Sequence, residues 1–124
     1  MFFPTVLLAQ TEPNDIALAS DEFQDSFYES LLQKGIENYD KAITALEKCQ
    51  KLQPNNATVY FEFGKNYLAQ KEYVKAYSSF EKATQIDPKN KWFWVGMYDV
   101  CYETKDYAQA IVIVTKLIEF KKEY

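Results

Sequence analysis

Two amphipathic helical patterns follow one another in the middle of the chain. Apolar or small side chains recur at spacings of three and four residues on one face of a first helix: Tyr60, Phe63, Gly64 and Tyr67. After a polar break, the same spacing indicates a second helix: Tyr73, Ala76, Phe80 and Ala83. Two helices separated by so short a break predict a helical hairpin.

This hairpin pattern recurs along the chain with a period of about 34 residues. Aromatic, small and large apolar positions then coincide in three units: Tyr39, Tyr73 and Tyr107; Ala42, Ala76 and Ala110; Leu46, Phe80 and Val114. Pro54 and Pro88 separate the units, and Asn56 and Asn90 are predicted to cap the helices that follow. Because one hairpin cannot bury both of its faces, the units are predicted to stack.

Composition removes most catalytic chemistry. The 124 residues contain no histidine, no arginine and three glycines, with a net charge of −4. Histidine-dependent nucleophilic relays and zinc sites are therefore absent, and the acidic balance argues against nucleic-acid binding. Cys49 and Cys101 fall on core-facing helical positions, where we expect free thiols. We expect a non-enzymatic protein without a cofactor or metal.

The middle unit resembles the tetratricopeptide repeat (TPR) family. Its residues follow the spacing of that family: Tyr60-x2-Phe63-Gly64-x2-Tyr67, then Ala76-x3-Phe80, then Pro88. The third unit is similar around Trp94 and Met97, but Tyr98 stands where the family has glycine. The first unit matches mainly in its second helix. The resemblance covers roughly residues 23–122.

The resemblance implies an all-α fold, an α-solenoid of about three helix-turn-helix repeats in a right-handed superhelix. The expected units are residues 21–54, 55–88 and 89–122 of a repeat domain over 21–124. It also implies a protein-protein interaction module, in which the first helices line a concave groove for a peptide or partner helix. The candidate groove residues are Phe27, Phe61, Lys65, Leu68, Trp92, Val95, Asp99 and Tyr102.

Each groove assignment has an alternative. The aromatic side chains could bury against neighbouring units, and Lys65 could be a solvated charge. Some members of the family hold a partner's C-terminal carboxylate with Lys, Asn and Arg on successive first helices. Here Lys65 and Asn66 are present, but Val95 and Asp99 follow on the next first helix and the chain has no arginine, so we do not expect that mode.

The last helical pattern, residues 107–120, is apolar around most of its circumference, whereas terminal repeats normally present a polar outer face. We predict that further repeats, a partner or a second copy covers it through Ile113, Val114, Leu117 and Ile118. This gives a second functional hypothesis, a structural spacer or self-association element of a longer repeat protein.

Residues 1–20 differ from the rest of the chain. An apolar run broken by Pro4 leads to Leu7-Leu8-Ala9, which suits the middle and cut site of a secretory signal, although its basic start is lacking. The run is too short to span a membrane. It predicts a signal-peptide remnant with a flexible spacer, and export to the periplasm or cell envelope. The alternative is a loosely packed tail on a cytoplasmic protein.

Overall fold

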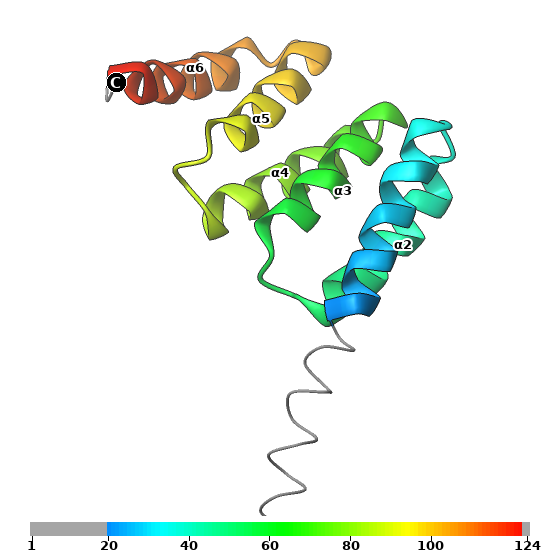
Figure 1. Cartoon of the computed structure of the whole chain (residues 1–124). Coiled ribbons are helices and arrows are strands. Elements are labelled where there is room, and N and C mark those ends of the chain that lie inside the picture. Colours follow the sequence, from blue (N-terminus) through cyan, green and yellow to red (C-terminus); the bar gives the residue numbers. More distant parts are fainter. Residues whose placement is uncertain (1–19, 123–124) are drawn as a thin grey trace, which may run out of the picture.

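The chain folds into a row of antiparallel helix pairs. The computed structural model describes residues 20–122, where a helix over residues 20–35 precedes five others. These are α2 (Tyr39–Leu52), α3 (Ala57–Ala69), α4 (Tyr73–Ile86), α5 (Lys91–Thr104) and α6 (Tyr107–Lys122). Figure 1 shows the hairpins side by side, from blue to red. The predicted all-α solenoid is confirmed. The proposed signal-peptide remnant falls on residues 1–19, which lie outside the described residues.

The turn inside each hairpin has the same backbone geometry. Glu37, Lys71 and Lys105 adopt left-handed backbone with φ of 63°, 62° and 60°. In each turn, two consecutive backbone N–H groups donate to carbonyls at the end of the preceding helix; the N–H of Lys71, for example, donates to the carbonyl of Leu68 at 2.9 Å. These three residues occupy the same position in successive units, so the sequence repeat is also a repeat of backbone structure.

The linkers between hairpins are set by proline and asparagine. Gln53 and Asp87, each followed by proline, leave the helical conformation with φ of −137° and −134°. The side chains of Asn56 and Asn90 each accept a hydrogen bond, at 3.0 and 3.1 Å, from the backbone N–H two residues further on. Both predicted helix caps are confirmed.

An aromatic side chain ties each linker to the helix that follows it. The hydroxyl of Tyr60 donates to the carbonyl of Pro54 at 2.7 Å. The indole N–H of Trp94, at the same position of the next unit, donates to the carbonyl of Pro88 at 2.9 Å. Tyrosine and tryptophan therefore serve equally well at this repeat position, because each combines an apolar body with one hydrogen-bond donor at its tip.

The middle and last hairpins are joined through a phenylalanine ring held between two glycines. Phe80 of α4 is 1% exposed. A Cβ atom placed on Gly64 of α3 or on Gly96 of α5 would lie 2.6 or 2.5 Å from carbon atoms of that ring. Since only glycine fits such a contact, Gly64 lets α3 approach α4 closely, and Gly96 of α5 makes the same contact with the ring.

Both cysteines lie in the interior. Cys49 and Cys101 are free and buried, as predicted. Burial raises the pKa of each thiol above its ordinary value. Each thiol is thereby kept protonated, and it contributes to packing rather than to nucleophilic chemistry.

Candidate binding surfaces

We give the name first-helix face to the candidate groove residues on the first helix of each hairpin. It comprises all the groove residues predicted from the sequence: Phe27, Phe61, Lys65, Leu68, Trp92, Val95, Asp99 and Tyr102. In the structure, some of these eight side chains pack between helices and others are exposed. Those on the first helix and α3 are mostly engaged in packing, whereas those on α5 include two that are largely exposed.

Phe61 and Phe27 are packing residues. The ring of Phe61 lies between those of Phe80 and Phe93, with centroids 5.7 and 5.2 Å apart. Phe27 stacks on Phe23 with centroids 5.9 Å apart and packs against the core of the first hairpin. Leu68 is half-buried against the core around Phe80. For these side chains, the structure favours burial between units over contact with a ligand.

Trp92 and Tyr102 of α5 are the large side chains that the first-helix face leaves open. Their exposed fractions are 59% and 64%. Tyr102 stacks on Tyr98, with centroids 6.3 Å apart. Half-buried Val95 and exposed Asp99 lie between them along the helix. Partial burial of the Asp99 carboxyl, with a smaller contribution from the Glu103 charge, raises its pKa above the ordinary value. This helix therefore offers two aromatic platforms on either side of an acidic group.

An ion-pair network joins the first hairpin to α3. A carboxylate oxygen of Glu62 lies 2.6 Å from Nζ of Lys34, and its other oxygen lies 3.4 Å from Nζ of Lys65. The Glu62 side chain is only 8% exposed. Burial and the nearby Lys34 ammonium lower the pKa of Lys65, and Glu62 offsets this only in part. Lys65 is thus neither a purely solvated charge nor a free ligand contact, since it helps to neutralise a buried carboxylate.

Sequence reasoning missed this network because Lys34 stands far from Glu62 along the chain, on a different hairpin. One signal was present. Glu62 occupies the repeat position of Gly96, which faces the preceding hairpin in the last unit. A carboxylate at a position that faces a neighbouring hairpin needs a partner, and a lysine near the end of the preceding first helix is suitably placed to supply one.

Replacing Glu62 by alanine is expected to lower the free energy of unfolding by about 1–2 kcal/mol, less than a fully buried pair would lose, because both lysines can regain water. Lys75→Ala is the matched control. It breaks the Lys75–Glu72 pair, 3.5 Å long with both side chains well exposed, and should cost under about 0.5 kcal/mol. Urea denaturation measures both variants. Equal losses would contradict a special role for Glu62.

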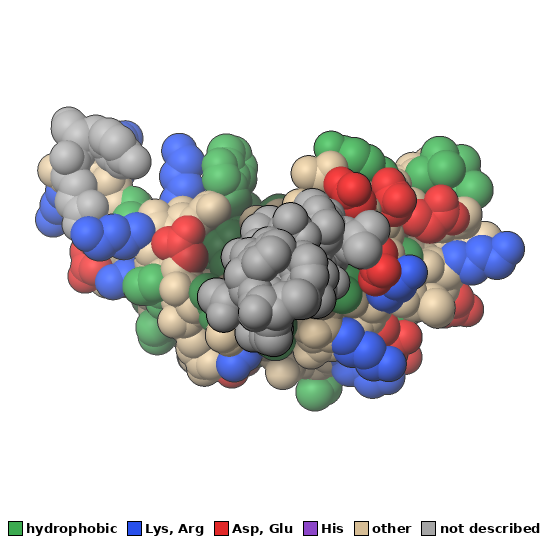
Figure 2. Space-filling view, turned by 60° about the horizontal axis from the view of Figure 1, so that its bottom comes forward, with side chains coloured by type: hydrophobic (Ala, Val, Ile, Leu, Met, Phe, Trp, Pro, Cys, Tyr) green, Lys and Arg blue, Asp and Glu red, His purple; other side chains and the backbone are tan. Residues whose placement is uncertain are grey.

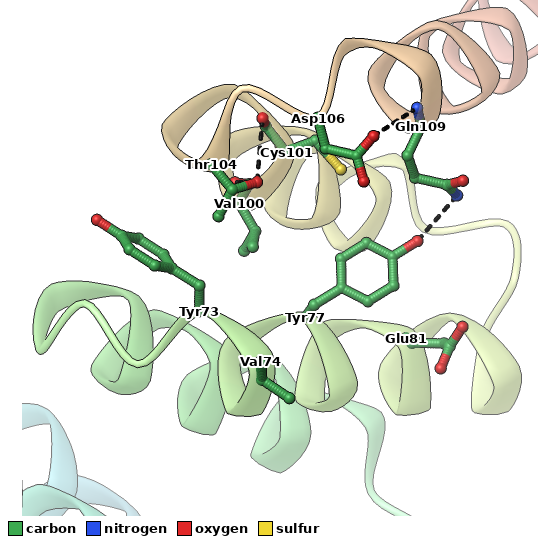
Figure 3. A pocket seen from close by; sticks show the side chains of 9 residues that line it. All are labelled: Tyr73, Val74, Tyr77, Glu81, Val100, Cys101, Thr104, Asp106 and Gln109. Carbon is green, nitrogen blue, oxygen red and sulfur yellow. Dashed lines mark hydrogen bonds between the residues drawn. The ribbon is translucent and has the colours of Figure 1, made fainter.

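A second surface lies between α4 and the hairpin of α5 and α6, where sequence reasoning placed no site. Figure 3 shows this groove, of about 540 Å³, with Tyr73 and Tyr77 on one side and Thr104 and Gln109 on the other. The hydroxyl of Tyr77 accepts a hydrogen bond from the side-chain amide of Gln109 at 3.0 Å. Burial raises the pKa of this tyrosine.

The same groove recurs one unit earlier with different chemistry. Its lining residues occupy the same repeat positions as six of those in Figure 3: Asp40, Ile43, Tyr67, Gln70, Glu72 and Lys75. The side-chain amide of Gln70 donates to the carboxylate of Asp40 at 2.7 Å. Both grooves thus arise from the stacking of neighbouring units, and each is crossed by a polar contact between two units.

The predicted packing residues of α6 separate into two groups. Ile113 is 1% exposed and belongs to the core that surrounds Phe80, so it is not available to a partner. Leu117 is half-buried against the same core. Val114 and Ile118 lie on the open side of the helix. The sequence showed apolar residues around α6 but not which side α5 would cover.

Within residues 20–122, no three or more potential ligating side chains gather in an arrangement suited to a metal ion. In that same part of the chain, no helix combines the length and apolarity needed to cross a membrane.

Solved structures similar to this chain are helical repeat proteins. MamA from Desulfovibrio magneticus matches 82% of this chain and 57% of its own, with 22% identity and a TM-score of 0.78. The TPR2B domain of yeast Sti1, in a complex with pHsp70, matches 82% of both chains at 17% identity, TM-score 0.77. The Sgt2 TPR domain from Aspergillus fumigatus matches 82% of this chain and 67% of its own at 25% identity, TM-score 0.75. This chain therefore spans little more than half the length of the MamA chain.

Sequence comparison points to the same group. A search of curated proteins found no significant match. Two sequence profiles, both described as tetratricopeptide repeat, match residues 30–56 and 67–123, and together they cover more than half of the chain. With the regularly recurring hairpins and the likeness to solved TPR structures, these matches show that the chain belongs to the tetratricopeptide repeat family.

Proposed function

We propose that this protein is a non-catalytic interaction module that holds a peptide or partner helix along its first-helix face. Two similar structures suit this role. The yeast Sti1 domain is in a complex with pHsp70, and a TPR of Spaghetti (RPAP3) is bound to an HSP90 peptide. At 17% and 14% identity these proteins share the fold with this chain, so the partner has to be argued from this chain's own side chains.

The observation that carries the proposal is the pair of exposed aromatic side chains on α5. Trp92 and Tyr102 lie on the first-helix face with Val95 and Asp99 between them, although most other aromatic side chains of residues 20–122 are used in packing. Exposed Trp and Tyr are the side chains that most often supply binding energy at protein interfaces. They offer apolar area at little cost in conformational entropy.

The charges on this face indicate the kind of peptide that fits. Asp99 on α5 lies between the two aromatic platforms, and Lys65, which is partly exposed, lies on the neighbouring α3. A partner segment with an apolar or aromatic anchor and a basic residue beside it would complement α5. A C-terminal carboxylate is a poor match, because the acidic group is on the face and Lys65 is already paired with Glu62.

A peptide-display selection tests this proposal. For a selected binder, Trp92→Ala and Tyr102→Ala should each raise the dissociation constant by about tenfold or more, the effect of removing a hot-spot side chain. Tyr107→Ala is the matched control, because Tyr107 is equally exposed but lies on α6. Phe61→Ala is not a clean probe, since it would disturb the core. Selected binders whose dissociation constants change with neither Trp92→Ala nor Tyr102→Ala would overturn the proposal.

A further inference from the structure

The two ends of the helix row carry apolar side chains at positions that are covered inside the row. Residues at equivalent repeat positions have equivalent neighbours wherever two hairpins meet. The internal joint between α4 and α5 therefore shows what each exposed end face would contact. At two joint positions on each end the side chains are apolar, whereas Asp25 and Glu29 of the first helix stand where Val59 and Phe63 pack against the preceding hairpin.

The first helix forms the N-terminal end of the row. In the internal joint, α5 faces α4 with Gly96 and Val100, both buried, and the same two repeat positions are also buried in α3. In the first helix these positions hold Tyr28 and Leu32, which are 64% and 59% exposed. Ile36, one turn later, is also exposed. We call the three apolar residues Tyr28, Leu32 and Ile36 the head face. Tyr28 and Leu32 stand at joint positions, whereas the position of Ile36 holds half-buried Gln70 and exposed Thr104 in the later units.

Helix α6 forms the opposite end of the row. In the internal joint, α4 presents half-buried Tyr77 and fully buried Phe80 to the next hairpin. The corresponding residues of α6 are Ile111 and Val114, followed by Ile118, and their exposed fractions are 67%, 37% and 51%. These three residues, the tail face, line a shallow groove of about 450 Å³ beside α5.

The charges at the two ends are opposite. The first helix carries four acids and no lysine over residues 21–29: Asp21, Glu22, Asp25 and Glu29. α6 finishes with Lys121 and Lys122. Because neighbouring helices in the row run antiparallel, the end of α6 would meet the start of a first helix stacked on it. Figure 2 shows acidic side chains gathered towards the end with the first hairpin, and lysine side chains at both ends.

We propose that copies of this chain stack head to tail, with the tail face of one copy against the head face of the next. The partner that fits the tail face is a second copy, because the head face supplies apolar side chains at the repeat positions that cover Phe80 inside the row, together with the complementary charge. The two faces differ, so the contact is heterologous and allows the row to continue from copy to copy.

Sedimentation velocity on the full chain, from low to several hundred micromolar, tests this proposal. The average mass is expected to rise with concentration. Ile118→Glu on the tail face and Leu32→Glu on the head face should each raise the dissociation constant by at least about tenfold, since each places a charge in an apolar contact. Val74→Glu is the control, because Val74 is an exposed apolar residue on α4 away from both end faces, and this variant should associate normally.

Mixing the two deficient variants distinguishes head-to-tail stacking from other arrangements. Ile118→Glu retains an intact head face and Leu32→Glu an intact tail face, so an equimolar mixture should form dimers and nothing larger. Reversing charge at Lys121 and Lys122 should weaken association, and reversing Asp21 and Glu22 in the partner copy should restore it. If circular dichroism shows that Ile118→Glu has lost helix, Ile111→Glu replaces it. Tyr28→Glu replaces Leu32→Glu in the same way.

Several results would overturn the proposal. A wild-type chain that stays monomeric over the whole concentration range would overturn it, whichever segment then covers the head and tail faces. A Leu32→Glu variant that still dimerises would indicate a symmetric contact between two tail faces. A mixture of the two variants that remains monomeric would exclude the complementary pairing of head and tail. The Trp92→Ala variant should associate normally, which separates this contact from peptide binding on the first-helix face.

Discussion

Phe80→Ala is expected to lower the free energy of unfolding by about 3–5 kcal/mol, the largest effect of any single truncation considered for this chain. Phe80 is buried, and within residues 20–122 it is the only side chain in close contact with glycines of two different hairpins. Its ring also packs on Phe61 of α3. Truncation therefore leaves a cavity where three helices meet, and relaxation of one helix cannot close it.

Urea denaturation followed by circular dichroism measures this loss. Trp92→Ala is a matched aromatic control, because Trp92 is mostly exposed, and its effect should stay within about 0.5 kcal/mol. If Phe80→Ala leaves no folded protein, Phe80→Leu provides a milder test, since Leu46 occupies the same repeat position in the first unit. A Phe80→Ala variant as stable as Trp92→Ala would mean that the last two hairpins are held together elsewhere.

The elements that the sequence predicted correctly depend on local signals. The caps at Asn56 and Asn90 involve hydrogen bonds that reach only two residues along the chain, and the prolines act on the residue just before them. Helical spacing also placed Cys49 and Cys101 in the interior. Each of these features is decided within one turn of helix, and the sequence repeat confirms it by presenting it more than once.

The predictions that needed the structure concern contacts between units. Phe61 and Trp92 are both aromatic residues on the first-helix face, yet one is held between two phenylalanine rings and the other is exposed. Comparison of the units gives one signal, since Phe61 stands where α5 has half-buried Val95 and Trp92 stands where α3 has exposed Thr58. The contacts themselves depend on how the next hairpin sits. The pairing of Glu62 with Lys34 and the choice of which side of α6 faces α5 have the same origin.

Comparison of the three units shows how one joint position can be filled in different ways. Between the first two hairpins, Leu46 takes the place of Phe80, and Ser30 and Glu62 stand where Gly64 and Gly96 lie in the next joint. The larger central side chain is thus accompanied by the smallest neighbours. The central and flanking substitutions thus change side-chain size in opposite directions, as expected of closely packed interiors.

Gly96→Ala should destabilise the protein by about 2–3 kcal/mol, although alanine normally favours a helix over glycine by about 1 kcal/mol. The added Cβ would lie 2.5 Å from the ring of Phe80. The ring cannot retreat from Gly96, because Gly64 lies equally close on its other side. Gly35→Ala is the control: nothing lies within 4 Å of a Cβ there and the backbone is not left-handed, so it should be neutral or stabilising.

A double-mutant cycle identifies the cause of the Gly96 effect. Phe80→Leu makes room beside Gly96, so Gly96→Ala should cost less in that background than in the wild-type chain, and the two changes should show a coupling energy of about 1 kcal/mol or more. Urea denaturation of the four proteins provides the measurement. Strictly additive losses would mean that alanine disturbs α5 independently of Phe80, in which case the tight contact across this joint would not be what holds the last two hairpins in register.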